Sequence, residues 1–337
     1  LRECESAAIH GYTAAAGDGA VRQGLADFMN KTYGADVRAD NFYMTCGAAA
    51  SLVISLKAIV EDASDEVILV APFFPEYTVF VQNAGAKSVI LPPDTEYFQI
   101  SLDAMEQAIT PKTRAVIINS PNNPSGVVYS AETYEKLAAL LERKSREIGH
   151  PIYLISDEPY REIIYDGLPI LYVPKFYRDT IICYSYSKSL SLPGERIGYI
   201  LVPDCVTAAK EVYTAVCGAG RFMGFVCAPH LFQDVILKCM GQTSDVDVYD
   251  QNRKLLYNGL KEMGYDCVYP SGAFYLFVKS PEPDAKAFSD KAKKLNLLIV
   301  PADSFGCPGY VRISYCVDPD MIRRSFAAFE KLMAQYR

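Results

Sequence analysis

The sequence has few of the residues that build metal sites and hydrolytic triads. Its three histidines, His10, His150 and His230, lie far apart and have no carboxylate partner nearby in the sequence. We therefore expect neither a histidine metal site nor a Ser-His-Asp triad. The ten cysteines include no Cys-x-x-Cys pair and no repeated spacing. This argues against a zinc site or a disulfide framework and favours reduced, mostly buried thiols in a cytoplasmic setting.

Other absences limit the partners of the protein. There is no run of Lys or Arg, and the net charge is -7, so nucleic acid and anionic membranes are not expected as main partners. We see no signal or transit peptide and no continuous apolar run long enough to span a membrane. Hydrophobic residues make up 50% of the chain, as in a globular protein. The expected partners are small molecules and a second copy of the chain.

Apolar runs that are typical of strands alternate with helical patterns from Glu66 onward. Buried runs with helices between them predict an α/β domain whose central sheet is mostly parallel and flanked by helices. The predicted strands of this domain are residues 67–70, 88–91, 115–118, 153–155, 181–184 and 199–202.

A second unit is expected at the carboxyl end of the chain. A length of 337 residues favours one large domain with a smaller companion. The pattern is helical from Pro203 to Lys261, and then predicts two strands and two helices, at residues 273–278, 311–315, 285–295 and 319–335. We therefore predict a large domain over residues 1–248 and a small α+β domain over residues 249–337.

One stretch of the chain, residues 185–198, combines a lysine with phosphate-binding groups. Lys188 follows an apolar strand-like run and lies in a hydroxyl-rich turn, and Arg196 follows one short loop later. A partly desolvated lysine can lose its proton, and the neutral amine condenses with an aldehyde. The hydroxyls of Ser185 and Ser187 and the guanidinium of Arg196 can hold a phosphate. Together they suggest pyridoxal phosphate, although a polar loop between two buried strands has the same composition.

The other candidates follow strands of the same domain. Ligands of such sheets bind at the carboxyl ends of the strands. Small residues at 47–49 precede an apolar helix, whose first N–H groups are open to an anion. An aromatic side chain held between prolines, an amide in a rigid turn, and a carboxylate with a nearby phenol follow three further strands: Phe74, Asn123, Asp157 and Tyr160. Each also has a plain structural interpretation as a core, capping or packing residue.

In this order the motifs resemble the class I and II aminotransferases, the fold-type-I enzymes that use pyridoxal 5'-phosphate. The likeness runs from about Tyr12 to Arg312, nearly the whole chain. Through residues 187–196 it extends to bacterial members described as aspartate-type aminotransferases. It implies the fold-type-I architecture, bound pyridoxal phosphate, and a homodimer with shared active sites. The family's amino-terminal arm is not recognisable, and we expect it to be missing from this sequence.

The resemblance assigns the groups that face the cofactor ring. It makes Lys188 the Schiff-base lysine and Asp157 the carboxylate that pairs with the pyridine nitrogen. A buried carboxylate there keeps the nitrogen protonated, so that the ring can accept electrons. Tyr160 and Asn123 are implied to be partners of the phenolic oxygen of the ring. Phe74 matches the aromatic residue that stacks on the ring, where the family more often has Tyr or Trp.

The resemblance also assigns the phosphate and substrate contacts. The phosphate is expected to bind the hydroxyls and guanidinium named above and the backbone N–H groups of Gly47, Ala48 and Ala49, although many relatives have a hydroxyl in that loop. Tyr12 matches the tyrosine that reaches the phosphate of the neighbouring subunit. Arg312, with Asn123, is implied to bind the α-carboxylate of the substrate in a bidentate pair.

These roles imply a ping-pong transfer of an amino group from an L-amino acid to a 2-oxo acid, with Lys188 as general base. Arg221 lies roughly where some aspartate aminotransferases have an arginine for the distal carboxylate, which favours aspartate and 2-oxoglutarate. A helix-capping or interface role for Arg221 is the alternative. Phe305 and the many tyrosines leave room for aromatic substrates. Two other functions stay open: a β-eliminating C-S lyase with the same residues, and an aminotransferase-like sensing domain.

Overall fold

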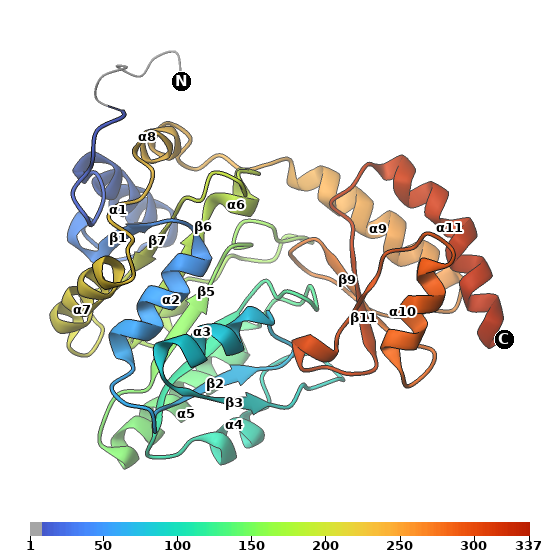
Figure 1. The fold of residues 1–337 in the computed structure, drawn as a ribbon, viewed down its shortest axis with the longest axis horizontal. Helices are drawn as coiled ribbons and strands as arrows, with labels where there is room; N and C mark the ends of the chain where they lie inside the picture. Colours follow the sequence, from blue (N-terminus) through green and yellow to red (C-terminus); the bar gives the residue numbers. More distant parts are fainter. Residues whose placement is uncertain (1–8) are drawn as a thin grey trace.

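A mixed sheet of seven strands forms the centre of the larger unit in the computed structural model, which describes residues 9–337 (Figure 1). The strand order is β1-β7-β6-β5-β4-β2-β3, and the pairs from β3 to β6 are parallel, whereas β7 is antiparallel to both of its neighbours. The predicted mostly parallel sheet is confirmed. The strands are β1 (Phe42–Thr45), β2 (Glu66–Val70), β3 (Lys87–Leu91), β4 (Thr113–Asn119), β5 (Tyr153–Asp157), β6 (Thr180–Ser185) and β7 (Gly198–Leu201).

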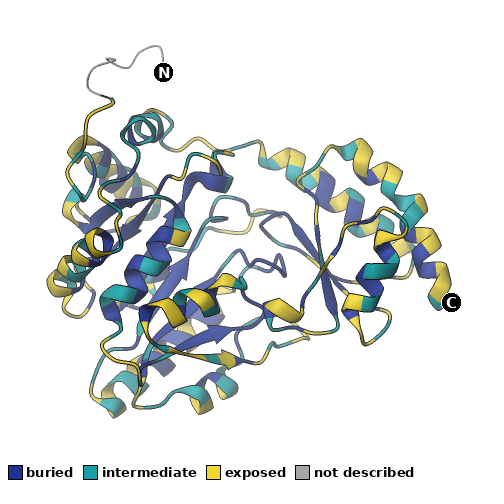
Figure 2. Ribbon diagram, in the orientation of Figure 1, coloured by how far each residue is buried: buried dark blue, intermediate teal, exposed yellow. Residues whose placement is uncertain are grey.

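Helices cover both faces of this sheet, and its strands other than the edge strand β3 are buried on both sides (Figure 2). Helices α2, α3 and α7 pack on one face, and α4 and α5, with α1 and α8, pack on the other. None of the helices in residues 9–337 is both long and apolar enough to cross a membrane. The helical segments of this unit are α1 (Gly19–Tyr33), η1 (Ala39–Asn41), α2 (Ala48–Ile59), α3 (Glu76–Ala84), α4 (Leu102–Ala108), α5 (Ala131–Ile148), η2 (Val173–Lys175), α6 (Tyr186–Ser189), α7 (Ala209–Phe222) and α8 (His230–Lys238).

The smaller unit is an antiparallel sheet of four strands, in the order β10-β11-β9-β8, with helices packed on it. This confirms the predicted α+β companion. The residue limits predicted for the two domains stay a prediction, and the limit at residue 248 falls in the first turn of α9. The elements of this unit are α9 (Val246–Glu262), β8 (Asp266–Val268), β9 (Tyr275–Lys279), α10 (Ala285–Lys293), β10 (Val300–Pro301), η3 (Asp303–Phe305), β11 (Tyr310–Ser314), α11 (Pro319–Met333) and η4 (Ala334–Tyr336).

A buried arginine on α9 forms hydrogen bonds with a carboxylate of the larger unit. Arg253 is almost fully buried, and its two terminal nitrogens donate to the two carboxylate oxygens of Asp166, each over 2.7 Å. It also donates to the backbone oxygen of Pro270 over 2.9 Å and forms an ion pair with Asp250 at 2.5 Å. The hydrogen bonds from Arg253 hold the pKa of Asp166 at about 2, below its usual range. The Asp166 contact therefore stabilises the fold above about pH 4 and is lost as the pH falls towards 2.

We expect Arg253→Met to lower the free energy of unfolding by about 2–4 kcal/mol, because it leaves two carboxylates without their shared cation. Arg323→Met is a matched control, since Arg323 pairs with Asp320 on the surface and such pairs contribute less than about 1 kcal/mol. Urea unfolding at pH 7 measures the free energy of unfolding of both variants. Equal stabilities of the two variants would contradict the assigned role of Arg253.

Candidate active site

The carboxyl ends of β4, β5 and β6 border a cavity of about 340 Å³, which side chains of the smaller unit close from the other side. Most of the residues that the sequence singles out line it. They come from segments far apart in the chain, and the sheet topology brings them together because parallel strands end at the same edge. The predicted residues that line the cavity are Ala48, Ala49, Phe74, Asn123, Asp157, Tyr160, Ser185, Ser187, Lys188, Arg196 and Arg312.

Lys188 lies on α6, the single helical turn that follows β6. The Ser185 hydroxyl caps this turn by accepting a hydrogen bond from the backbone N–H of Ser187 over 3.0 Å. Partial burial lowers the pKa of the Lys188 ammonium, and the positive charges of Arg196 and Arg312 act in the same direction. A larger share of Lys188 is therefore a neutral amine, which is the form that acts as nucleophile or base.

Asp157 is the last residue of β5 and is buried. Its Oδ2 accepts a hydrogen bond from the Tyr77 hydroxyl over 2.5 Å, whereas its Oδ1 is buried and has no hydrogen-bond partner in the described structure. Burial raises the pKa of this carboxyl to about 7, against the opposing effect of the Tyr77 hydrogen bond. An unpartnered carboxylate oxygen on a cavity wall is suited to a cationic N–H group of a ligand.

One wall of the cavity is built to hold an anion. Gly47 has φ +90°, and a Cβ at this position would lie 2.7 Å from a guanidinium nitrogen of Arg196. Helix α2 begins directly after Gly47, so N–H groups of its first turn are free to bind a ligand. The Ser185 hydroxyl donates to the Ser187 hydroxyl over 2.5 Å, and Arg196 donates to Ser187 over 3.5 Å. A cation, two hydroxyls and a helix N-terminus thus converge here.

The opposite wall presents a second arginine. Arg312, on β11, donates through Nη1 to Oδ1 of Asn123 over 2.7 Å. Its guanidinium carbon lies 4.5 Å from the ring centroid of Tyr275 and 5.0 Å from that of Phe305. The hydroxyls of Tyr160 and Tyr275 lie 2.9 Å apart. These contacts fix the plane of a guanidinium that can bind a carboxylate in a bidentate pair.

Two predicted residues lie away from this cavity within one chain. Tyr12 is 88% exposed, and Arg221 is exposed in the last turn of α7. Neither side chain lines the cavity. Both were predicted to act in the site of a neighbouring subunit, and that prediction stays untested by the structure of one chain.

The sequence analysis missed three polar residues of the site: Tyr77, Asn119 and Tyr275. Tyr77 lies in the first turn of α3, three residues after Phe74, and its hydroxyl donates a hydrogen bond to Asp157. Asn119 accepts the backbone N–H of Asn123 over 2.8 Å and donates to the backbone oxygen of Asp157 over the same distance. The position of Asn119 at the end of a predicted strand is a signal that could have found it. Tyr275 lies inside a predicted strand, where an aromatic residue looks like core.

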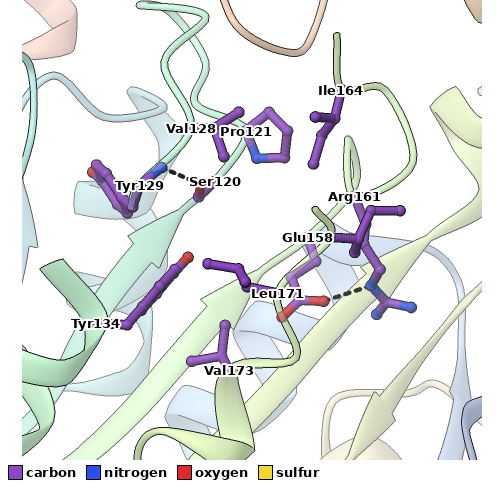
Figure 3. A pocket seen from close by; sticks show the side chains of 11 residues that line it. Ser120, Pro121, Val128, Tyr129, Tyr134, Glu158, Arg161, Ile164, Leu171 and Val173 are labelled. Carbon is purple, nitrogen blue, oxygen red and sulfur yellow. Dashed lines mark hydrogen bonds and ion pairs between the residues drawn. The ribbon is translucent and has the colours of Figure 1, made fainter. Parts of the chain in front are cut away.

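A much smaller cavity, of about 20 Å³, lies beside the turn after β5 (Figure 3). Glu158 and Arg161 line it, and the Arg161 Nε donates to a Glu158 oxygen over 2.6 Å. This volume holds about one water molecule and no substrate. The buried ion pair therefore supports the turn that carries Asp157 and Tyr160 and is not itself a binding site.

Fold and site together define a class of proteins. Residues 2–329 match the family described as aminotransferase class I and II, and the chain belongs to this family. A crystal structure of an amino transferase from Eubacterium rectale is 60% identical and superposes with a TM-score of 0.98, covering 99% of this chain and 84% of that one. The predicted family is therefore confirmed.

Relatives with assigned substrates are more distant. The chain is 30% identical to an aromatic-amino-acid aminotransferase of Thermococcus litoralis, over 94% of this chain and 82% of that protein. It is also 30% identical to an aspartate aminotransferase of Thermotoga maritima, over 96% of this chain and 83% of that protein. These two relatives carry different substrate names at the same identity, so the comparison gives the reaction class and not the substrate.

Proposed function

We propose that the protein is a pyridoxal-phosphate-dependent aminotransferase whose active site is the 340 Å³ cavity. The observation that carries the proposal is the unpartnered Oδ1 of Asp157, in one cavity with Lys188 and an anion-binding wall. Pyridoxal phosphate has an aldehyde, a protonatable ring nitrogen and a phosphate, and the three groups of the cavity match these in kind. The residues present therefore fit this cofactor.

Each residue has one partner in this proposal. Lys188 would condense with the aldehyde and release water, Asp157 would pair with the ring nitrogen, and Tyr160 and Asn123 would hold the phenolic oxygen of the ring. Phe74 would face the ring. The backbone of residues 47–49, the hydroxyls of Ser185 and Ser187, and Arg196 would hold the phosphate. When bound, pyridoxal phosphate supplies an electron sink for the charge left when a bond at the substrate Cα breaks.

The chain's own residues then orient the substrate and move one proton. Arg312, held by Asn123, binds the α-carboxylate of the amino acid and so fixes the direction of the Cα–H bond. After the amino group of the substrate has displaced Lys188 from the aldehyde carbon, the free amine of Lys188 would take the Cα proton and return it at that carbon. Partial burial lowers the pKa of Lys188, which supports this role, since a base must lose its own proton first. Release of a 2-oxo acid and reversal with a second one give ping-pong kinetics.

The proposed substrates are L-aspartate and 2-oxoglutarate, in a homodimer with shared active sites. In the part of the chain that the structure describes, the cations that line the cavity are Lys188, Arg196 and Arg312, and each already has a role. A distal carboxylate therefore needs a cation from outside, and we assign Arg221 from a second copy of the chain to it. Tyr12 from that copy is assigned to the phosphate.

Aromatic amino acids are the second candidate. The rings of Tyr275 and Phe305 both lie near the guanidinium of Arg312, and the ring centroid of Phe274 lies 5.5 Å from Nζ of Lys188. These rings offer an apolar surface beside the place proposed for the substrate carboxylate. The name of the Thermococcus relative agrees with this possibility.

The test is an absorbance scan of the protein loaded with pyridoxal phosphate. We expect the visible band to fall on adding L-aspartate and to return with 2-oxoglutarate. In Arg221→Ala the KM for aspartate should rise about 10- to 100-fold through loss of a charged hydrogen bond, with the KM for phenylalanine unchanged. Arg323→Ala, which removes a surface arginine of the smaller unit, is the control.

Each other outcome favours a named alternative. A band that cycles with phenylalanine but ignores aspartate would discard the role of Arg221 and support the aromatic candidate. Ammonia and pyruvate formed without any 2-oxo acid would indicate a β-eliminating C-S lyase. A band that no amino acid changes would favour a sensing domain over an enzyme.

A further inference from the structure

Tyr275 lines the candidate active site, and none of the roles above uses its hydroxyl. It is the first residue of β9 and is buried. Its hydroxyl lies 2.9 Å from that of Tyr160, and its ring centroid lies 4.5 Å from the guanidinium carbon of Arg312. One side chain therefore contacts both the residue proposed for the ring oxygen of the cofactor and the residue proposed for the carboxylate of the substrate.

The direction of the hydrogen bond between the two tyrosines follows from the proposed function. A phenol has one hydrogen to donate, and its oxygen can also accept. If Tyr160 donates to the ring oxygen of the cofactor, it has no hydrogen left for Tyr275, so Tyr275 must be the donor. A hydroxyl that accepts one hydrogen bond is polarised and donates the next one more strongly. The Tyr275 hydroxyl thus strengthens the hydrogen bond that Tyr160 gives.

The ring of Tyr275 acts on Arg312. The guanidinium carbon lies 4.5 Å from the ring centroid of Tyr275 and 5.0 Å from that of Phe305, and its Nη1 donates to Asn123. A guanidinium on aromatic faces gains cation–π stabilisation and is held in one plane. Bidentate binding of a carboxylate depends on that plane. Loss of one ring therefore weakens the grip on a carboxylate while the charge of Arg312 stays.

We propose that Tyr275 is a positioning residue of this active site, which acts on Tyr160 through its hydroxyl and on Arg312 through its ring. The proposal rests on the proposed function and adds a residue that links the cofactor end of the site to the substrate end. The other titratable groups near the two tyrosines are Asp157 at the end of β5 and Cys316 after β11, with Lys188 on the cavity wall. Substitution of Tyr275 leaves all of them in place.

Two substitutions separate the two actions. Tyr275→Phe removes the hydroxyl and keeps the ring, whereas Tyr275→Leu removes both. Tyr315→Phe is the matched control, because it removes a buried hydroxyl of the same unit that donates to the backbone oxygen of Ala273 over 3.3 Å and does not line the cavity. Each variant is loaded with pyridoxal phosphate. We measure the pH midpoint of its visible band, and by calorimetry its Kd for maleate and for 3-phenylpropionate, which carry a carboxylate but no amino group.

In Tyr275→Phe we expect the band midpoint to rise by about 0.5 to 1 pH unit, the equivalent of one hydrogen bond. Weaker donation from Tyr160 leaves the negative ring oxygen less stabilised, so the nitrogen of Lys188 beside it keeps its proton to higher pH. Both Kd values should stay within about twofold of wild type, which is near the error of such a comparison. In Tyr275→Leu the midpoint should rise equally, and both Kd values should increase about 5- to 30-fold through loss of the cation–π contact.

These measurements distinguish a failure of the proposal for Tyr275 from a failure of the proposed function. If the wild-type protein forms the band but both Tyr275 variants behave like Tyr315→Phe, the proposal for Tyr275 is wrong and the proposed function stands. Unchanged Kd values in Tyr275→Leu would overturn the action on Arg312, and an unchanged midpoint in Tyr275→Phe would overturn the action on Tyr160. A wild-type protein that forms no band with pyridoxal phosphate would overturn the proposed function, and the role of Tyr275 with it.

Discussion

Lys188→Ala should lower the rate of amino transfer at least about 10⁴-fold, because under the proposed function one side chain serves as both covalent anchor and base. Lys188 has two properties that these two roles require: it lies on the cavity wall, and partial burial lowers its pKa. The variant should also lose the visible band that wild type forms with pyridoxal phosphate. Single-turnover absorbance after adding aspartate measures the first effect, and a scan of the loaded protein measures the second.

Lys286→Ala is the control for this result. Lys286 is exposed on α10, where it pairs with Asp290 over 3.0 Å. Its loss should leave band and rate within about twofold of wild type, since surface changes of this kind have small effects. A Lys188→Ala protein that keeps both the band and the rate would mean that another amine is the anchor.

Asp157→Asn should lower kcat about 10²- to 10³-fold and, at the same time, make the cofactor-free protein more stable. Under the proposed function the first effect follows because an amide would not hold a positive charge on the ring nitrogen, and one aligned electrostatic group contributes roughly this much. The second follows from the buried carboxyl, whose pKa is about 7 in the fold and near 4 in an unfolded chain. Below about pH 4 both states are protonated, so the carboxyl has no effect. Between pH 4 and 7 the unfolded state is favoured increasingly as it ionises.

The stability gain of Asp157→Asn should therefore be small near pH 4 and reach about 1–3 kcal/mol at pH 8. Urea unfolding of the cofactor-free proteins at these two pH values tests it. Asp303→Asn, at an exposed position, is the matched control and should show no such pH dependence. A stability gain that is the same at both pH values would show that the carboxyl of Asp157 is not held in its protonated form.

The sheet could be predicted from the sequence because its strands are uninterrupted apolar runs. The rule that ligands bind at strand carboxyl ends then placed Asn123, Asp157 and Lys188 at one edge, and the structure brings these side chains to one cavity. The antiparallel direction of β7 could not be predicted, since an apolar run has no direction. The first strand predicted from the sequence is residues 67–70, whereas the structure has an earlier edge strand, β1, at Phe42–Thr45.

The rest of the site depends on contacts between distant residues. Tyr77 bonds a carboxylate 80 positions away, and Tyr275 meets a phenol 115 positions away. No local pattern encodes such pairs, and buried tyrosines are common in this chain. Tyr12 and Arg221 mark a different limit, because their predicted roles involve a second copy of the chain and one chain cannot test them.

The unpartnered oxygen of Asp157 also has a consequence for the stability of the protein in a cell. A ligand that binds only the folded state stabilises it in proportion to the logarithm of its concentration above Kd. Under the proposed function, pyridoxal phosphate would give the buried Oδ1 of Asp157 a hydrogen-bond partner and would bind the partly buried amine of Lys188. Newly made chains would then be most open to proteases before they meet pyridoxal phosphate. The amount of the folded protein in a cell would then depend on the supply of pyridoxal phosphate as well as on the rate of protein synthesis.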